Sequence, residues 1–176
     1  MIFRDATRKD VSAIAELHAE SWRSAYRGIL SDDYLENRVH VERLSTWRVR
    51  FSEKTMKPMF VIVAEAEHGL AGFICVFPEE SAVWGSFLDN LHVAPQFIGQ
   101  GIGRQLVSEG ARTLVSCGSR GGLYFWVLEQ NKKARRFYER AGAVTVGSAE
   151  NPMPDGRSVL ALRCHWPDLS RLVLKG

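Results

Sequence analysis

Apolar residues recur at helical spacing in some stretches of the chain and gather in strand-like runs in others. The change between these patterns predicts where the helices and strands lie. Helical spacing after a capping pair, Thr7 and Asp10, predicts a helix that begins near residue 8 and ends around Gly28. Cap residues at 31–33 predict a second helix that runs toward Arg50. Two helices are therefore expected before the strand-rich part of the sequence.

β-Branched and aromatic residues gather in short runs that are typical of strands. These runs cover residues 1–6, 59–67, 70–77, 83–95, 123–129 and 158–166. His68 and Gly69 separate two of the runs and predict a hairpin. Helical spacing returns at 101–116 and at 131–141, and one or two strands follow the last helix. This order predicts an α/β fold with a mixed sheet, in which antiparallel hairpins lie beside a right-handed crossover through 101–116.

The composition fits one globular domain spanning residues 1–176, because 45% of the 176 residues are hydrophobic and 24% are charged. The formal charge is +3 without a dense run of Lys or Arg, which argues against nucleic-acid binding and suits an anionic small ligand. Three cysteines without a C-x-x-C pair argue against a disulfide framework. The charged N-terminus and the short apolar runs predict neither a signal peptide nor a membrane span, so a cytoplasmic protein is expected.

Three glycines stand at alternate positions in the stretch VAPQFIGQGIGRQL, between a predicted strand and a predicted helix: Gly99, Gly101 and Gly103. Their spacing fits neither a P-loop nor the dinucleotide pattern G-x-G-x-x-G. Residues 98–103 include no Ser, Thr, Asp or Asn that could cap the helix, so its first amides need another acceptor. Arg104 opposes the helix dipole unless an anion binds there. The turn is therefore interpreted as an anion site, the alternative being a merely flexible turn.

The glycine turn and a later helix together resemble a known family. The segments LHVAPQFIGQGIGRQLV and NKKARRFYERAGAV resemble the pyrophosphate loop and the asparagine-to-tyrosine helix of the GNAT superfamily of N-acetyltransferases, which bind acetyl-CoA. The order of the other elements fits this family from residue 1 to about 165. The family usually has Gln or Arg where this chain has Ile98, so a side-chain contact is lost there. The resemblance implies a mostly antiparallel central sheet with flanking helices and a splayed parallel pair of strands.

The resemblance also implies a set of contacts with acetyl-CoA. The backbone at 91–93 would pair with the pantetheine arm like an added strand, and the amides at 99–104 would bind the pyrophosphate. The implied cofactor-binding residues are Leu91, His92, Val93, Gly99, Gln100, Gly101, Ile102, Gly103, Arg104 and Asn131. Asn131 is explained equally well as the N-cap of its helix. Lys132 and Lys133 in the first turn are either solvated surface or neighbours of the 3′-phosphate.

The implied reaction is direct attack by a neutral amine on the acetyl thioester in a ternary complex, with no metal and no covalent enzyme intermediate. The resemblance places Tyr138 beside the thioester sulfur, which makes it the candidate acid for the departing thiolate. Asn131 and Tyr138 are seven residues apart and lie on one helical face, which supports this pair. The alternative is a core tyrosine. Asp89 and Glu129 are candidate bases, with a solvated strand residue and a strand-end charge as alternatives. His92 is a third candidate, although a lone strand histidine is more often structural.

The acceptor amine is expected across the sheet from acetyl-CoA, beside the first two helices and the loop between them. Trp22 and Tyr26 are candidate substrate-binding residues, and Tyr34 falls in the same region, with core packing as the alternative for each. A small-molecule amine or a peptide amine is the expected partner, without nucleic acid or membrane, and a homodimer is left open. Two further functions stay open: acetylation of a protein N-terminus or lysine, and non-catalytic sensing of an acyl-CoA.

Overall fold

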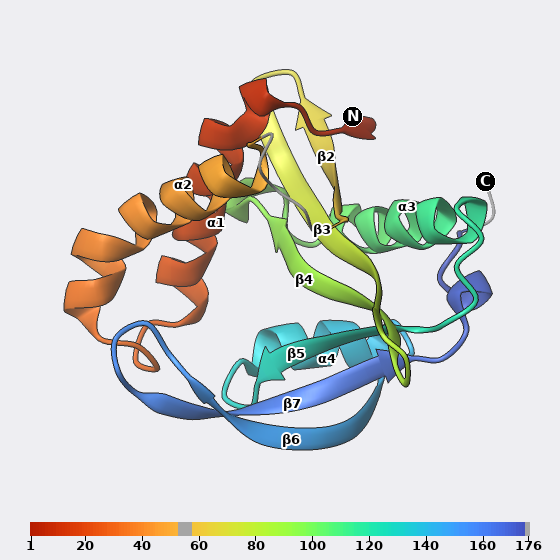
Figure 1. Ribbon diagram of the computed structural model, residues 1–176. Helices are drawn as coiled ribbons and strands as arrows, with labels where there is room; N and C mark the ends of the chain where they lie inside the picture. Colours follow the sequence, from red (N-terminus) through yellow and green to blue (C-terminus); the bar gives the residue numbers. More distant parts are fainter. Residues whose placement is uncertain (53–57, 175–176) are drawn as a thin grey trace.

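The computed structural model describes residues 1–52 and 58–174, which form one seven-stranded sheet with helices on both of its faces (Figure 1). The strand order is β1-β2-β3-β4-β5-β7-β6. Neighbouring strands are antiparallel except for β4 and β5, which are parallel. The predicted mixed α/β sheet is therefore confirmed.

The elements follow the sequence predictions closely. Along the chain they are β1 (Ile2–Asp5), η1 (Arg8–Asp10), α1 (Val11–Ala25), η2 (Tyr34–Arg38), α2 (Val39–Arg50), β2 (Phe60–Ala66), β3 (Gly69–Ser81), β4 (Gly85–Val93), η3 (Pro95–Phe97), α3 (Ile102–Ser116), β5 (Leu123–Leu128), α4 (Lys132–Arg140), β6 (Val144–Pro152), β7 (Ser158–Trp166) and η4 (Leu169–Arg171). The final segment contains two strands, β6 and β7, and β3 continues four residues beyond its predicted end at Phe77.

Local capping explains where the first two helices begin. The carboxylate of Asp10 accepts from the amide of Thr7 at 2.7 Å, and the Thr7 hydroxyl accepts from the amide of Lys9 at 3.3 Å, which is the expected capping box. The hydroxyl of Ser31 accepts from the amide of Tyr34 at 3.3 Å. The second helix therefore starts at the predicted cap, and its first turns are π-helical before α2 begins.

The parallel strands β4 and β5 separate soon after they meet. Of the described residues, only Ser86 with Leu123 and Phe87 with Tyr124 are paired between them, although the strands are nine and six residues long. The remaining part of β4 pairs with β3 on its other side and includes a β-bulge, where Asp89 has no partner on β3. The splay expected from the resemblance is therefore present, and it opens the sheet between its two helical layers.

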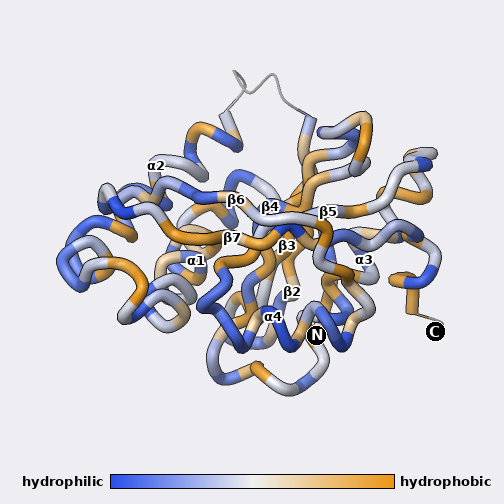
Figure 2. Tube along the Cα trace, turned by 90° about the horizontal axis from the view of Figure 1, so that it is seen from below, coloured by the Kyte–Doolittle hydropathy of each residue, from blue (hydrophilic) through white to orange (hydrophobic). Residues whose placement is uncertain are grey.

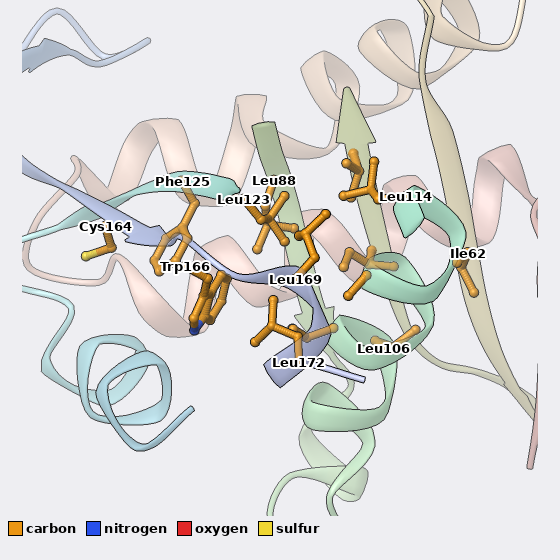
Figure 3. Packing of buried hydrophobic residues seen from close by; sticks show 14 of the residues in the cluster. Ile62, Leu88, Leu106, Leu114, Leu123, Phe125, Cys164, Trp166, Leu169 and Leu172 are labelled. Atoms are coloured by element: carbon orange, nitrogen blue, oxygen red, sulfur yellow. The ribbon is translucent and has the colours of Figure 1, made fainter. Parts of the chain in front are cut away.

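Each face of the sheet has its own apolar core, and Figure 2 shows hydrophobic residues concentrated along the central strands. On one face, α3 packs on β2, β3 and β4 and against the chain after β7, and the core continues over β5 and β7; Leu106, Leu114, Phe125, Trp166 and Leu172 are among its residues (Figure 3). On the other face, α1 and α2 pack on β2 and β3 around Trp47 and Phe73. A third cluster, around Leu30, Tyr34 and Leu128, lies where α1 and the loop after it meet β5 and β7.

Within the described residues, 1–52 and 58–174, no helix has both the length and the apolar character needed to cross a membrane. The same residues include no group of three His, Cys, Asp or Glu side chains placed to hold a metal ion.

Candidate active site

The glycine turn uses its three glycines for two different purposes. Gly99 and Gly101 have φ values of +87° and +82°, a left-handed conformation that disfavours any side chain. A Cβ atom at either position would meet nothing within 4 Å, so the space beside the turn is open. At Gly103, a Cβ would lie 3.3 Å from the ring of Phe137, so this glycine lets α3 pack closely against α4.

The start of α3 presents main-chain amides that lack a partner. Gly101 is the N-cap and gives no side-chain hydrogen bond, and the first turn contains no acidic residue. The first helical bond joins the amide of Gln105 to the carbonyl of Gly101 at 3.1 Å. No described group accepts from the amides that precede it, those of Gly99, Gly101, Ile102, Gly103 and Arg104. Unpaired amides with a positive dipole end favour an anion at this position.

A basic pocket adjoins this turn, between the start of α3 and the length of α4. It has a volume of about 670 Å³ and is lined by Arg104, Lys132, Lys133, Arg136, Phe137, Arg140 and Ala141. No acidic residue lines it, and none of its five cations forms an ion pair with a described residue. Figure 2 shows α4 as a mainly hydrophilic helix. The pocket is therefore suited to a ligand with several negative charges.

Asn131 and Tyr138 occupy the two ends of the predicted helical face on α4. The Oδ1 atom of Asn131 accepts from the amide of Ala134 at 3.2 Å, so this residue is the N-cap. The ring of Tyr138 lies 4.0 Å from Phe125 and 5.8 Å from Trp166, centroid to centroid, and its hydroxyl forms no hydrogen bond with a described residue. Burial raises the pKa of Tyr138, and the nearby Tyr26 raises it further. The phenol therefore stays protonated at neutral pH, as a proton donor must.

The last residues of β4 alternate between the two layers beside the splay. Leu91 and Val93 pack with the core on the α3 side, whereas the ring of His92 lies 4.5 Å from that of His18 on α1. The indole of Trp47 donates to Nδ1 of His18 at 3.1 Å. Burial, aided by the positive charge of Arg43, lowers the pKa of His92 to about 3, and burial holds the pKa of His18 well below its ordinary value. Both imidazoles are therefore neutral at pH 7.

An aromatic pocket lies on the opposite layer from the basic pocket. It has a volume of about 260 Å³ and is lined by Trp22, Tyr26, Arg43, Trp126, Leu128, Asn151, Pro152, Met153, Pro154 and Ala161. Trp22 and Tyr26, the predicted acceptor residues, are in contact edge to face at 5.1 Å. Tyr34 does not line the pocket: it is 1% exposed and its hydroxyl donates to Glu42 at 2.8 Å, in agreement with the packing alternative.

The β6–β7 hairpin, which lines the aromatic pocket with residues 151–154, lies beside the loop between α1 and α2 (Figure 1). The carboxylate of Asp155 accepts from the amide of Ser31 at 2.8 Å, and the guanidinium of Arg157 donates to the carbonyl of Ile29 at 2.9 Å. Burial raises the pKa of Asp155, but the amides of Ser31 and Arg157 together with the charge of Arg157 lower it more, so it lies below its ordinary value. The side chains of Asp155 and Arg157 thus connect the hairpin to a loop more than 120 residues earlier in the chain.

The two candidate bases lie outside both pockets. Asp89 forms an ion pair with Arg50 at 2.6 Å and accepts a short hydrogen bond from the amide group of Asn90. Glu129 is exposed at the end of β5, and its backbone carbonyl accepts a hydrogen bond from the guanidinium of Arg135 at 3.1 Å. The placement of Glu129 agrees with a strand-end charge, whereas Asp89 is an ion-paired residue rather than the solvated strand residue of the alternative interpretation. Their catalytic roles stay predictions.

Sequence reasoning missed several residues that line the pockets. Arg136 and Arg140 follow Lys132 at successive intervals of four, so helical periodicity could have placed them in the basic pocket. No local signal marks Arg43 or Trp126, because α2 and β5 meet in the aromatic pocket only in the folded chain.

Comparisons with known proteins agree with this geometry. The family model described as the acetyltransferase (GNAT) family matches residues 12–143. The uncharacterized N-acetyltransferase YuaI of Bacillus subtilis (strain 168) is 30% identical over 171 residues, which are 96% of this chain and 94% of the relative.

Two solved structures show the same fold. The PaiA N-acetyltransferase of Thermoplasma acidophilum, in complex with coenzyme A, superposes with a TM-score of 0.67 at 22% identity over 92% of this chain and 96% of that one. The yncA protein of Salmonella typhimurium, solved with its cofactor acetyl-CoA, gives a TM-score of 0.65 at 18% identity over 95% and 93% of the two chains. With the family model matching most of its length, the chain belongs to the acetyltransferase (GNAT) family.

Proposed function

We propose that this protein transfers the acetyl group of acetyl-CoA to a primary amine by direct attack in a ternary complex. The observation that supports this most strongly is the set of unpaired amides at Gly99 and at 101–104 directly beside five unpaired cations. Structural neighbours bind coenzyme A or acetyl-CoA. The pyrophosphate of coenzyme A would accept hydrogen bonds from the amides, and its 3′-phosphate would pair with the cations.

The described residues offer contacts for the pyrophosphate and the pantetheine arm of acetyl-CoA. Main-chain amides of Gly99, Gln100, Gly101, Ile102, Gly103 and Arg104 would contact the pyrophosphate. The edge of β4 at Leu91, His92 and Val93, which β5 leaves free at the splay, would pair with the pantetheine arm. Asn131 keeps its side-chain NH₂ available while its oxygen caps α4, so it can serve in both roles.

The reaction then takes place at the splay. The neutral amine attacks the carbonyl carbon, the carbon–sulfur bond breaks, and Tyr138 gives its proton to the departing thiolate. The proton lost by the amine passes to a water molecule and from it to the base, Asp89 or Glu129. After burial, Tyr26 is the next cause of the raised pKa of Tyr138, although the two residues belong to opposite layers, which supports access from the aromatic pocket to the thioester.

The aromatic pocket favours a small amine over a protein substrate. Its volume is about 260 Å³, and the β6–β7 hairpin is bound to the α1–α2 loop at its edge. An N-terminal peptide or lysine acetyltransferase needs an open groove at this place, so that function is the second candidate. An acyl-CoA sensor would not need a protonated phenol at the splay.

The proposal is tested by measuring acetyl-CoA binding and thiol release on the same preparations. Acetyl-CoA should stabilise the wild-type protein, by about 2.7 kcal/mol at 100 times its Kd. Tyr138→Phe should keep that stabilisation but slow thiol release by about 100-fold. Tyr34→Phe, which removes a hydroxyl outside both pockets, should leave turnover of the folded protein unchanged. Absence of stabilisation at millimolar acetyl-CoA would refute the proposal.

A further inference from the structure

Arg43 is the charged residue among those lining the aromatic pocket. Its guanidinium lies 4.5 Å from the centroid of the Trp22 ring, and its side chain is 16% exposed. Its Nε atom is buried and has no hydrogen-bond partner among the described residues. The nearest carboxylate, Glu42, is 3.8 Å away and already accepts from Tyr34 and Arg38. Arg43 therefore has N–H donors without a full set of acceptors, at a position that is little exposed to solvent.

A second cation lies close to the same pocket on β7. Arg163 is two residues beyond Ala161, which lines the pocket, so both side chains are on one face of the strand. Its guanidinium is 4.6 Å from the centroid of the Trp126 ring, and its buried Nε atom also lacks a described partner. Two cations thus stack on the aromatic rings of the pocket, while no acidic residue lines it.

This charge arrangement discriminates between classes of amine. A polyamine or an aminoglycoside would bring further positive charge toward two arginines in a pocket that no carboxylate lines. A carboxylate on the acceptor would instead bind the planar guanidinium of Arg43 through paired hydrogen bonds. The positive field also favours the neutral form of the amine, which is the form that attacks the thioester.

The size and lining of the pocket restrict the acceptor further. Its volume of about 260 Å³ is below the roughly 300–1,000 Å³ typical of sites for drug-sized ligands. Trp22, Tyr26 and Trp126 provide flat apolar surface, and Leu128 and Met153 extend it. A single apolar side chain fits this lining.

We infer that the acceptor is a free α-amino acid with an apolar or aromatic side chain, whose carboxylate binds Arg43 and whose side chain lies among the aromatic rings. This inference rests on the proposed function, because it assigns the acceptor of that reaction. It makes Arg43 the residue that determines acceptor specificity.

Matched pairs of amines that differ only by the carboxylate test this inference: phenylalanine with 2-phenylethylamine, leucine with 3-methylbutylamine, and tryptophan with tryptamine. For at least one pair, kcat/KM should be ten or more times higher for the amino acid, and spermidine should be a poorer acceptor than that amino acid. Arg43→Gln should bring the ratio within the pair to about one without changing acetyl-CoA affinity. Arg48→Gln, the same change at an exposed position of α2, should leave the ratio as in the wild type.

A preference for spermidine or for the decarboxylated amines would overturn the inference, and so would a ratio that Arg43→Gln leaves unchanged. If none of these amines is acetylated, thermal shifts of the CoA-loaded protein test whether the carboxylate is recognised. The amino acid should raise Tm more than its decarboxylated partner in the wild type but not in Arg43→Gln, and equal shifts would overturn the inference. Failure of the proposed function is distinct, because acetyl-CoA itself would then leave Tm unchanged.

Discussion

The basic pocket and the aromatic pocket lie on opposite layers of one sheet and are assembled in opposite ways. The basic pocket and its glycine turn come from two short stretches, 99–104 and 131–141, and rely on main-chain amides and a repeated helical face. The aromatic pocket takes side chains from α1, α2, β5, β7 and the β6–β7 hairpin. A ligand group common to a whole family can be bound by backbone geometry, whereas a particular acceptor must be recognised by side chains gathered from distant segments.

Disrupting the backbone of the glycine turn should have the largest effect. Gly101→Val places a β-branched side chain at φ +82°, which forces the turn to rearrange and removes two or more amide contacts with the pyrophosphate. We expect acetyl-CoA affinity to fall about 100-fold, equivalent to about 2.7 kcal/mol. Isothermal titration calorimetry measures the loss directly.

Gly118 provides a matched control for this substitution. It follows the other end of α3, has φ +80°, and a Cβ there would also meet nothing within 4 Å. Gly118→Val should therefore cost similar folding stability while leaving acetyl-CoA affinity at the wild-type level. Equal affinities in Gly101→Val and the wild type would show that the amides of the turn do not bind the cofactor.

The sequence predicts the cofactor side of this comparison much better than the acceptor side. The conformation at Gly99 and Gly101 can be predicted locally, because alternating glycines before an uncapped helix predict a turn with free amides. The splay was expected only from the family resemblance, since strand pairing depends on residues far apart. Arg43 and Trp126 give no local signal, because their proximity arises when α2 and β5 meet through tertiary packing. Trp22 and Tyr26, which the family resemblance places beside the acceptor, both line the aromatic pocket, and their substrate-binding role stays a prediction.

The neutral pair His18 and His92 adds no positive charge to the layer beside α1 at pH 7. Because His92 would become charged on unfolding, this layer should make the stability of the protein depend on pH. His92 has a pKa of about 3 in the folded protein, through burial and the charge of Arg43, against about 6.5 when unfolded. The unfolded chain therefore binds more protons between these values, and the free energy of unfolding falls as pH drops below 6.5. Between pH 7 and pH 5 this group should account for a loss of at most about 2 kcal/mol.

Urea unfolding of the wild type and His92→Gln at pH 7, 6 and 5 measures that contribution. The variant should lose less stability than the wild type over this range, because residue 92 no longer takes up a proton on unfolding. His18 lies against His92 and keeps its own lowered pKa, so part of the pH dependence should persist in the variant. Identical pH dependence in the two proteins would mean that His92 titrates normally when folded.

Reversing one charge in the basic pocket should have the smallest effect and sharpen the comparison most. Arg136 lies on the cationic face of α4 between Lys132 and Arg140, and the remaining cations should partly compensate for its loss. Arg136→Glu should therefore weaken CoA binding only about tenfold at low ionic strength, and less at 0.5 M salt, because exposed charges are screened. Arg112→Glu on α3, away from both pockets, is the matched control. Dephospho-CoA should bind the variant and the wild type within a factor of two or three if these cations contact the 3′-phosphate. An equal loss for both ligands would instead place the charge of Arg136 at the pyrophosphate, and the five cations would then support the amide turn rather than form a phosphate site of their own.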